Sequence, residues 1–410
     1  MKLLHTADIH LGTTTYGRVD PEAGVNSRLL DFERSFEFMV ERALDEDVDA
    51  FIFAGDAYRT PDPSPTQQRI FARCLQPLAD AGIPIVMIVG NHDHPVSFGK
   101  ASSIDIFQYV TGDVHLFAKP GTGTVETASG PLQVVALPWP VRSRLLSREE
   151  HRDKSSDEVQ EYIEKTYLEL LRSAADQLDP GVPAVLVGHL TVQGSSLAGS
   201  ERTSLVAHEP VFTPGQLARE PLDYVALGHI HKHQDRNPNG DIPVVYSSSI
   251  ERVSFKEWDE DKGFVLVNID ASGEEKTTGY EFVETPARPY ASIRVDAREA
   301  DDPTAHIVGA IGRVDVTDAI VRVGYRIHEK QAPEVDHSQI REALGAAQTI
   351  ASIEREVEAA ERRRRTEVRR ESSLEDALGQ YVDQRDELSS IKDDLIEAGL
   401  ELEAELEEGG

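Results

Sequence analysis

The sequence of 410 residues predicts an α/β protein, because short apolar runs alternate with segments whose apolar residues recur at helical spacing. Ala50–Ala54 and Ile83–Val89 are apolar runs of strand length, and a glycine follows each of them. In Phe32–Leu44 the apolar side chains fall three or four residues apart, which is typical of a helix packed against a sheet. Strands and helices in this order predict a sheet core covered by helices.

Helix boundaries can be predicted for two further segments. Ser64 and Pro65 are a start signal for a helix over Thr66–Ala81, because serine caps a helix and proline is accepted in its first turn. A third long helix is expected over Ser156–Ala175, where apolar residues share one face. Further strands are expected at Val114–Phe117, Leu132–Leu137, Val244–Tyr246 and Phe264–Ile269.

The pattern changes near residue 285, which predicts a second structural unit. Tyr290–Val295 and Ala319–Ile327 have the composition of strands, with a helix expected over Pro303–Ile311 between them and another over Gln339–Ala347. This is the size of a small βαβα module. We therefore expect three parts, at residues 1–285, 286–350 and 351–410.

The last part combines a basic segment with two amphipathic stretches. Glu361–Arg370 contains six arginines against two glutamates. Two short helices bury too little surface to fold alone, so we expect them to dock either on the rest of this chain or on a partner's coiled coil. Their apolar stripes consist of Leu374, Leu378, Tyr381 and Val382, and of Leu388, Ile391, Leu395 and Ile396.

The composition excludes several classes of protein. A single cysteine, Cys74, rules out a disulfide framework, so a cytoplasmic location is expected. The first strand begins at once and leaves no room for a signal peptide, and no apolar run is long enough to span a bilayer. The net charge of −31 argues against a nucleic-acid partner. However, residues 371–410 hold 14 acidic residues against Arg385 and Lys392, and bound cations would offset carboxylates elsewhere.

Five short motifs place Asp, Asn or His directly after predicted strands. Side chains at the ends of several strands can converge on one point of a sheet, although they lie far apart in the sequence. Their oxygen and nitrogen donors suit Mn²⁺, Fe²⁺, Zn²⁺ or Mg²⁺. Two such cations about 3.5–4 Å apart can clamp a phosphate and activate a water. The motifs are Asp8-Ile9-His10, Gly55-Asp56, Gly90-Asn91-His92-Asp93, Gly188-His189 and Gly228-His229-Ile230-His231.

Individual roles can be assigned within this set. A carboxylate has two oxygens, so Asp56 is the candidate to bridge two metals, and Asn91 can ligate through its amide oxygen. His92 could protonate a leaving group, and Asp93 could orient a histidine. The alternative for each motif is structural, since an Asn/Asp-rich turn can satisfy its own backbone and a single histidine is more often a core residue. All five motifs together favour a site.

This ordered set of motifs resembles that of the calcineurin-like metallophosphoesterases, which include protein phosphatases, cyclic-nucleotide phosphodiesterases and nucleases. Two departures argue against the protein phosphatases, namely the Ala57-Tyr58-Arg59 that follows Asp56 and the Asp93 that follows Asn91-His92. More of the chain is similar to the SbcD-type nuclease subunits. The similarity is carried by Leu4-His5-Thr6-Ala7-Asp8-Ile9-His10-Leu11-Gly12, by Tyr246-Ser247-Ser248-Ser249-Ile250-Glu251-Arg252 and by Lys262-Gly263-Phe264.

The resemblance implies a four-layer β-sandwich flanked by helices, with a small α+β capping domain that engages DNA and a C-terminal helical pair that binds an SbcC-like ATPase. It also implies two divalent metal ions, usually Mn²⁺, and a homodimer formed by the helices near Thr66–Ala81 and Ser102–Tyr109. Many members carry a histidine where Arg59 stands; this cation could contact DNA phosphate. The implied ligands are Asp8, His10, Asp56 and His231 for one ion, and Asp56, Asn91, His189 and His229 for the other, with His92 assisting cleavage.

The expected function is therefore that of a metal-dependent DNA nuclease, acting as a 3′–5′ exonuclease on duplex ends and as an endonuclease on single strands and hairpins. A phosphodiesterase for small nucleotides or phosphoproteins would use the same site. It would turn over a cyclic nucleotide rapidly and would not need the capping domain. A non-catalytic scaffold would lack some of the ligands, and none of them is missing.

Overall fold

The computed structural model describes residues 1–94, 100–110, 112–141, 155–197, 209–273, 275–358, 373–383 and 392–408. Among these residues, no helix is both apolar enough and long enough to traverse a lipid bilayer. The basic segment Glu361–Arg370 lies outside the described residues.

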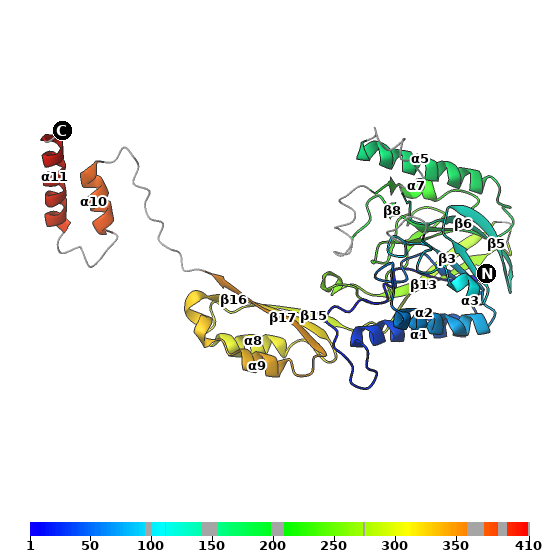
Figure 1. Cartoon of the computed structure of the whole chain (residues 1–410), viewed down its shortest axis with the longest axis horizontal. Helices are drawn as coiled ribbons and strands as arrows, with labels where there is room; N and C mark the ends of the chain where they lie inside the picture. Colours follow the sequence, from blue (N-terminus) through cyan, green and yellow to red (C-terminus); the bar gives the residue numbers. More distant parts are fainter. Residues whose placement is uncertain are drawn as a thin grey trace.

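Two six-stranded sheets face each other in the first part of the chain (Figure 1). The first sheet has the strand order β14, β13, β1, β2, β3, β4, and the second has the order β11, β12, β10, β7, β6, β5. The first comprises β14 (Thr277–Glu284), β13 (Gly263–Asp270), β1 (Lys2–Thr6), β2 (Ala50–Phe53), β3 (Ile85–Ile88) and β4 (Val114–Phe117). The second comprises β11 (Gln234–Asp235), β12 (Val244–Tyr246), β10 (Tyr224–Gly228), β7 (Ala184–His189), β6 (Gly130–Leu137) and β5 (Gly121–Thr127).

Helices cover both outer faces of this sandwich, as Figure 1 shows. On one side α1 (Ser27–Asp45) and α2 (Pro65–Asp80) bury their apolar stripes against the first sheet. On the other side α5 (Ser156–Ala175) and the short α7 (Pro214–Leu217) cover the second sheet. Alternate strand residues face inward, so a third core fills the space between the sheets. The four-layer α/β arrangement that the sequence predicts is confirmed.

The helix boundaries follow from local chemistry. Ser64 caps α2 and exchanges hydrogen bonds with Gln67, and Ser155 and Glu158 form the same capping box at the start of α5. The helix expected over Ser102–Tyr109 is wrong in extent, because α3 covers only Phe107–Val110 and the preceding residues form turns. Asp105 accepts a hydrogen bond from the side chain of Gln108, so the polar side chains of these two residues pair locally.

Strand direction brings the predicted motifs to one edge of the sandwich. β1, β2 and β3 run parallel, so their carboxyl ends lie at the same edge of the first sheet. β7 and β10 are also parallel, and Gly228 is paired with His189 at their carboxyl ends. The loops that carry the five motifs therefore begin at the carboxyl ends of parallel strands in the two sheets.

The second unit is a three-stranded parallel sheet with helices on one face. β15 (Tyr290–Asp296), β16 (Ile320–His328) and β17 (Thr349–Glu358) pair in that order, and α8 (Pro303–Ile311) and α9 (His337–Ala343) cover an apolar core. A 3₁₀ segment, Glu329–Glu334, follows β16. The sheet thus continues past residue 350, where the sequence places the end of this unit. On the other face, charged cross-strand pairs such as Arg326–Glu356 replace an apolar layer.

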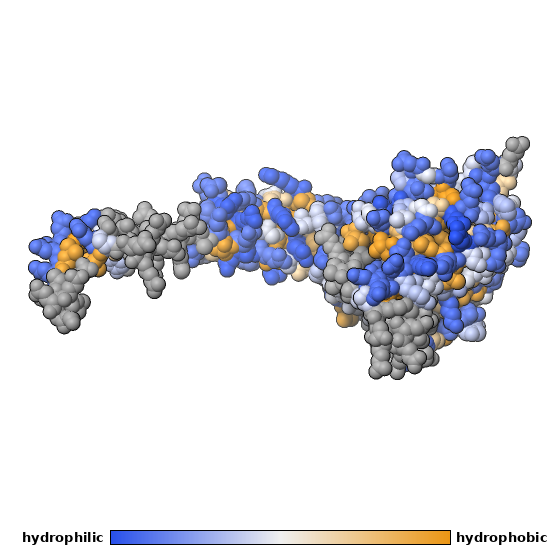
Figure 2. Space-filling model, turned by 90° about the horizontal axis from the view of Figure 1, so that it is seen from above, coloured by the Kyte–Doolittle hydropathy of each residue, from blue (hydrophilic) through white to orange (hydrophobic). Residues whose placement is uncertain are grey.

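The C-terminal part contains α10 (Leu374–Asp383) and α11 (Lys392–Glu408), which pack on each other. Val382 is buried, whereas Tyr381, Leu395 and Leu400 are exposed. Figure 2 shows apolar residues gathered beside hydrophilic ones at this end of the molecule, and a mainly hydrophilic surface over the second unit. The two helices that the sequence predicts here are thus present, and they keep apolar side chains at the surface. Leu388 and Ile391, from the second predicted stripe, lie outside the described residues.

His5 makes the stability of the sandwich dependent on pH. The ring lies between the sheets with Nδ1 3.0 Å from the Tyr224 hydroxyl, and burial lowers the pKa of His5 to about 3. In the unfolded chain the imidazole titrates near 6.5, so the unfolded state binds the extra proton as pH falls. We expect this group alone to cost about 3 kcal/mol of stability between pH 7 and pH 4.

Urea unfolding of metal-free protein at pH 7 and pH 4 measures this effect. His5→Gln should reduce the difference between the two pH values by about that amount. His306→Gln, at an exposed position of α8, is the matched control and should leave the difference unchanged. An unchanged pH dependence in the His5 variant would contradict the prediction.

Candidate metal centre

The five strand-end motifs meet between the two sheets. Asp8 and His10 follow β1, Asp56 follows β2, and Asn91 follows β3. The facing sheet supplies three imidazoles, from His189 at the end of β7 and from His229 and His231 after β10. All of these side chains are buried except that of Asn91, which is partly exposed.

One group of donors is formed by Asp8, His10 and His231. Their nearest ligand atoms lie within 4.8 Å of one another, and the Nε2 atoms of His10 and His231 are 2.9 Å apart. At most one proton can lie between two nitrogens at that distance. At least one lone pair is therefore directed into the pocket, as a metal ligand requires.

A second group is formed around the amide of Asn91. Its Oδ1 lies 2.9 Å from Nε2 of His189 and 3.2 Å from Nδ1 of His229. Nδ1 of His189 lies 2.7 Å from the carbonyl oxygen of Ala54, which fixes the ring and leaves Nε2 for the pocket.

Asp56 lies between the two groups. Its Oδ2 is 3.6 Å from Nε2 of His10 and 3.5 Å from Nε2 of His189. The same oxygen therefore lies near a donor of each group, so Asp56 could serve as a ligand to two cations. The bridging role that the sequence analysis expects of Asp56 stays a prediction.

The protonation states fit cation binding. Burial opposes the ionised form of Asp56, but His189 and His10 outweigh it and hold the pKa of this carboxyl well below its usual range. Burial, with the neighbouring His231, places the pKa of His10 well below its ordinary value, so the ring is neutral at pH 7. An ionised carboxylate beside a neutral imidazole is the form in which both groups bind metal ions.

The pKa values of two further side chains, Asp8 and His189, indicate that the pocket lacks positive charge that a cation would supply. Burial raises the pKa of Asp8 to about 7, so its negative charge lacks full compensation from the protein. Burial alone would lower the pKa of His189, but Asp56 outweighs it and raises that pKa to about 9. The proton on His189 occupies a position that a divalent cation would take, and binding would release it.

The backbone around the ligands is strained. Asp8, His10, Asp56 and His229 have positive φ angles of 53°, 48°, 63° and 98°. Such conformations cost about 1–3 kcal/mol each for residues other than glycine, and they occur mainly where function requires them. Gly90 is required for close packing, since a Cβ there would collide with Asp56.

Asp93 holds the Asp56 loop. Its carboxylate accepts hydrogen bonds from the backbone N–H groups of Asp56 at 2.7 Å, Ala57 at 2.9 Å and Gly90 at 3.0 Å. These contacts show that Asp93 orients the loop of Asp56, and the histidine-orienting role that the sequence predicts for it stays a prediction. Backbone donors, which every residue carries, gave no signal in the sequence.

His92 lies at the mouth of the pocket. Its ring is partly exposed and packs edge-on against His10, with the centroids 4.7 Å apart, and its backbone N–H donates to Oδ1 of Asp56 at 2.8 Å. Nδ1 of His92 is 2.9 Å from the carbonyl oxygen of Arg59. Arg59 therefore orients His92 through its backbone, while its side chain is exposed.

Three residues near the site carried no assignment from the sequence. Oε1 of Glu257 lies 3.1 Å from Nδ1 of His231, and Oε2 of Glu209 lies 3.1 Å from Nε2 of His229. The Trp139 ring packs beside the His229 ring, with the centroids 5.0 Å apart. None of the three belongs to a strand-end motif, so only the folded chain brings them to the site.

A β-sandwich that brings buried Asp and His side chains and a partly exposed Asn together at the ends of facing strands is typical of a metallophosphoesterase. The calcineurin-like phosphoesterase family model matches residues 1–233. The SbcD subunit of the nuclease SbcCD from Bacillus subtilis (strain 168) is 30% identical over 299 residues, covering 70% of this chain and 71% of that protein. Its counterpart from Escherichia coli (strain K12) is 27% identical over 277 residues, covering 66% and 65%. The chain belongs to the calcineurin-like phosphoesterases, as an SbcD-type member.

Among solved structures, a dimetal phosphatase from Danio rerio matches with a TM-score of 0.39 and 10% identity, over 68% of this chain and 98% of that one. The family membership implies divalent metal ions, and the donor groups described above are suitable to hold them.

Proposed function

We propose that the chain is the nuclease subunit of an SbcC–SbcD-type complex and cleaves DNA phosphodiesters, as a 3′–5′ exonuclease on duplex ends and as an endonuclease on single strands and hairpins. The observation that carries the proposal is the position of Asp56 between two groups of donors, with His92 at the pocket mouth. The two relatives are named as subunits of a nuclease, which supports a nucleic acid as the substrate.

The ligand sets in this proposal are Asp8, His10, Asp56 and His231 for one cation and Asp56, Asn91, His189 and His229 for the other. Two divalent cations, Mn²⁺ in the proposal, would supply Lewis-acid activation of water and would neutralise charge on the phosphate when bound.

The protein itself positions these groups and moves the proton. Asp93 fixes the loop of Asp56 through hydrogen bonds from two of its backbone N–H groups, those of Asp56 and Ala57, so the carboxylate is placed before substrate arrives. Nδ1–H of His92 donates to the Arg59 carbonyl, so the imidazolium form of His92 would give its Nε2 proton to the departing oxygen and become neutral. The exposed Arg59 guanidinium is proposed to contact a DNA phosphate.

The acidic composition is compatible with a DNA substrate. Fourteen of the acidic residues lie in the C-terminal segment 371–410. The proposed metal ligands lie between Asp8 and His231, far from this segment in the sequence. Cations bound by Asp8 and Asp56 would offset two further charges at the site. The capping unit, residues 286–358, is proposed to engage DNA, and the surface around α2 and α3 is proposed to form a homodimer.

Cleavage assays with the full chain test the proposed function. Supercoiled plasmid, a linear duplex, a hairpin and a cyclic nucleotide are incubated with Mn²⁺ or Mg²⁺, with and without the SbcC-type ATPase. Cleavage of the DNA forms in Mn²⁺ is the expected result. Rapid turnover of the cyclic nucleotide alone would favour a small-nucleotide phosphodiesterase, and intact DNA in every condition would refute the proposal.

The C-terminal helices give a separate prediction about the ATPase partner. Deleting residues 371–410 should abolish association with the ATPase, because the exposed apolar residues Tyr381, Leu395 and Leu400 are the proposed docking surface. Hydrolysis of bis(4-nitrophenyl) phosphate should be unchanged, since none of the described residues of the deleted segment, 373–383 and 392–408, contributes to the pocket. Co-purification with a tagged ATPase measures association.

Two full-length variants accompany this deletion, one as a second test and one as its matched control. Leu378→Asp changes the predicted apolar stripe and should weaken association, whereas Glu375→Gln changes an exposed position of the same helix and should not. Unchanged co-purification of the deletion variant would defeat the prediction.

A further inference from the structure

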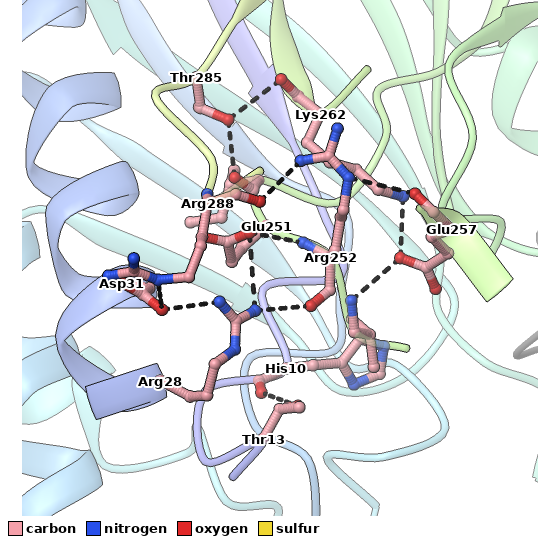
Figure 3. A network of polar contacts seen from close by, with 12 residues as sticks. His10, Thr13, Arg28, Asp31, Glu251, Arg252, Glu257, Lys262, Thr285 and Arg288 are labelled. Atoms are coloured by element: carbon pink, nitrogen blue, oxygen red, sulfur yellow. Dashed lines mark hydrogen bonds and ion pairs between the residues drawn. The ribbon is translucent and has the colours of Figure 1, made fainter. Parts of the chain in front are cut away.

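A chain of buried charged residues connects the candidate metal centre with the border of the capping unit (Figure 3). Its members come from α1, from the segment between β12 and β13, and from the segment that leads into β15. Five of its side chains are nearly inaccessible to solvent, with at most 2% exposed: Arg28, Asp31, Glu251, Glu257 and Lys262. A charge in such a position requires partners, because its hydration is lost.

At the metal end, Glu257 contacts a proposed ligand. His231 turns Nε2 toward His10 and Nδ1 toward Glu257, whose Oε1 is 3.1 Å away. Metal-binding histidines usually donate their second ring N–H to a carboxylate or carbonyl, which fixes the tautomer and the ring orientation. Glu257 is placed to accept this proton.

Lys262 fixes Glu257 in turn. Its Nζ is 2.9 Å from Oε2 of Glu257 and donates to the His231 carbonyl oxygen at 3.0 Å. The backbone N–H of Val253 also donates to Oε2 of Glu257, at 3.0 Å. The ring and the backbone of His231 are thus held by one ion pair.

Arg252 anchors the backbone of this region. Its guanidinium donates to the carbonyl oxygens of Glu257 at 3.2 Å, Glu260 at 2.6 Å and Arg288 at 3.0 Å. Arg288 donates to the Asp318 carbonyl, just before β16 of the capping unit, at 2.7 Å. The position of Glu257 is therefore tied to the border between the two units.

Stability alone does not account for the pair of Glu257 and Lys262. Removing two charges from water costs several kcal/mol per ion, and well-packed apolar residues in their place are often neutral or stabilising. A positional role explains why the ion pair lies against His231 rather than elsewhere in the core.

We propose that Glu257, held by Lys262, is a positioning residue that fixes the imidazole of His231 for metal binding. The proposal rests on the metal site of the proposed function. It adds a carboxylate–histidine pair that none of the strand-end motifs contains.

Metal affinity measured by titration calorimetry with MnCl₂, on the full chain, tests this role without depending on catalysis. The double variant Glu257→Leu and Lys262→Met replaces the ion pair by apolar side chains and leaves His231 without an acceptor. We expect its Mn²⁺ affinity to fall by about 10–100-fold, as is typical when such a partner is lost. A cooperative thermal unfolding transition of the metal-free variant is the control that it is folded.

A rescue variant separates positioning from a merely structural effect. Glu257→Gln with Lys262→Met restores a neutral acceptor for the His231 N–H and should recover part of the lost affinity. The matched control removes a different ion pair, Asp223 with Lys276, whose atoms lie 2.8 Å apart at the amino end of β10. Asp223→Leu with Lys276→Met should leave Mn²⁺ affinity unchanged.

The outcomes distinguish this inference from the proposed function. Wild-type affinity in the Glu257→Leu and Lys262→Met variant would overturn the positioning role and leave the nuclease proposal intact. Equal loss in the Leu/Met and Gln/Met variants would also overturn it, because the acceptor would then have no effect. Absence of Mn²⁺ binding by the unaltered chain would instead refute the proposed metal site.

Discussion

Replacing Asp56 by asparagine should remove both metal ions and with them the phosphodiesterase activity. Oδ2 of Asp56 lies 3.6 Å from a His10 nitrogen and 3.5 Å from a His189 nitrogen, so its charge serves both donor groups. Loss of an outer partner of a metal ligand already costs roughly 10–100-fold in affinity. We expect a larger loss, of more than about 100-fold, for the shared ligand, because two cations would lose a negative charge. Titration with MnCl₂ and hydrolysis of bis(4-nitrophenyl) phosphate measure the two effects.

Asparagine is the appropriate replacement because of the backbone. Asp56 has a φ of 63°, a conformation that asparagine adopts more readily than most residues, so the loop should keep its shape. Asp47→Asn is a matched control, since Asp47 is exposed, has a φ of 49° and lies after α1, outside the strand-end motifs. Retention of two bound ions by the Asp56 variant would show that this carboxylate is not shared.

The fold could be predicted from the sequence wherever local patterns determine it. Ala50–Phe53 and Ile85–Ile88 are buried on both faces, so their sequences are continuous apolar runs that need no alternation. The capping boxes at Ser64 and Ser155 likewise act within four residues of the chain. These elements agree with their predicted positions to within a few residues.

β17 was missed because its stabilisation is not local. The second half of Thr349–Glu358 alternates glutamates with other residues and has no apolar run, which is typical of a linker. Its glutamates are paired across the sheet, with Arg326 donating to Glu356 at 2.7 Å and Arg298 donating to Glu358 at 2.6 Å. Those arginines lie 30 and 60 residues away, so a pattern within the strand cannot reveal the pairing.

The same distinction holds for the candidate site. Each strand-end motif could be read because parallel strands bring their carboxyl ends to one edge, which makes position along the chain informative. Glu257 lies in a short 3₁₀ turn, and its role follows from a contact with His231 across 26 residues. A glutamate in a turn is usually a solvated surface residue, so burial had to be seen before function could be inferred.

Replacing His92 by glutamine should abolish cleavage while both metal ions remain bound. The His92 ring lies at the mouth of the pocket, and Nδ1 is occupied by the Arg59 carbonyl, so the ring offers Nε2 to the departing oxygen. Loss of a general acid typically lowers kcat by about 10²–10⁴-fold, and glutamine cannot supply a proton at neutral pH. Mn²⁺ stoichiometry by calorimetry and single-turnover cleavage of a labelled hairpin measure the two quantities.

The result separates the chemistry of His92 from its structural contact. Its backbone N–H, which donates to Asp56 at 2.8 Å, is retained in His92→Gln, so the shared carboxylate should stay in place. His306→Gln, on the exposed face of α8, controls for a general effect of losing an imidazole. Loss of both ions from the His92 variant would make this residue part of the metal-binding set. Full activity with both ions bound would require another proton donor, for which the pocket mouth would have to admit water to the leaving oxygen.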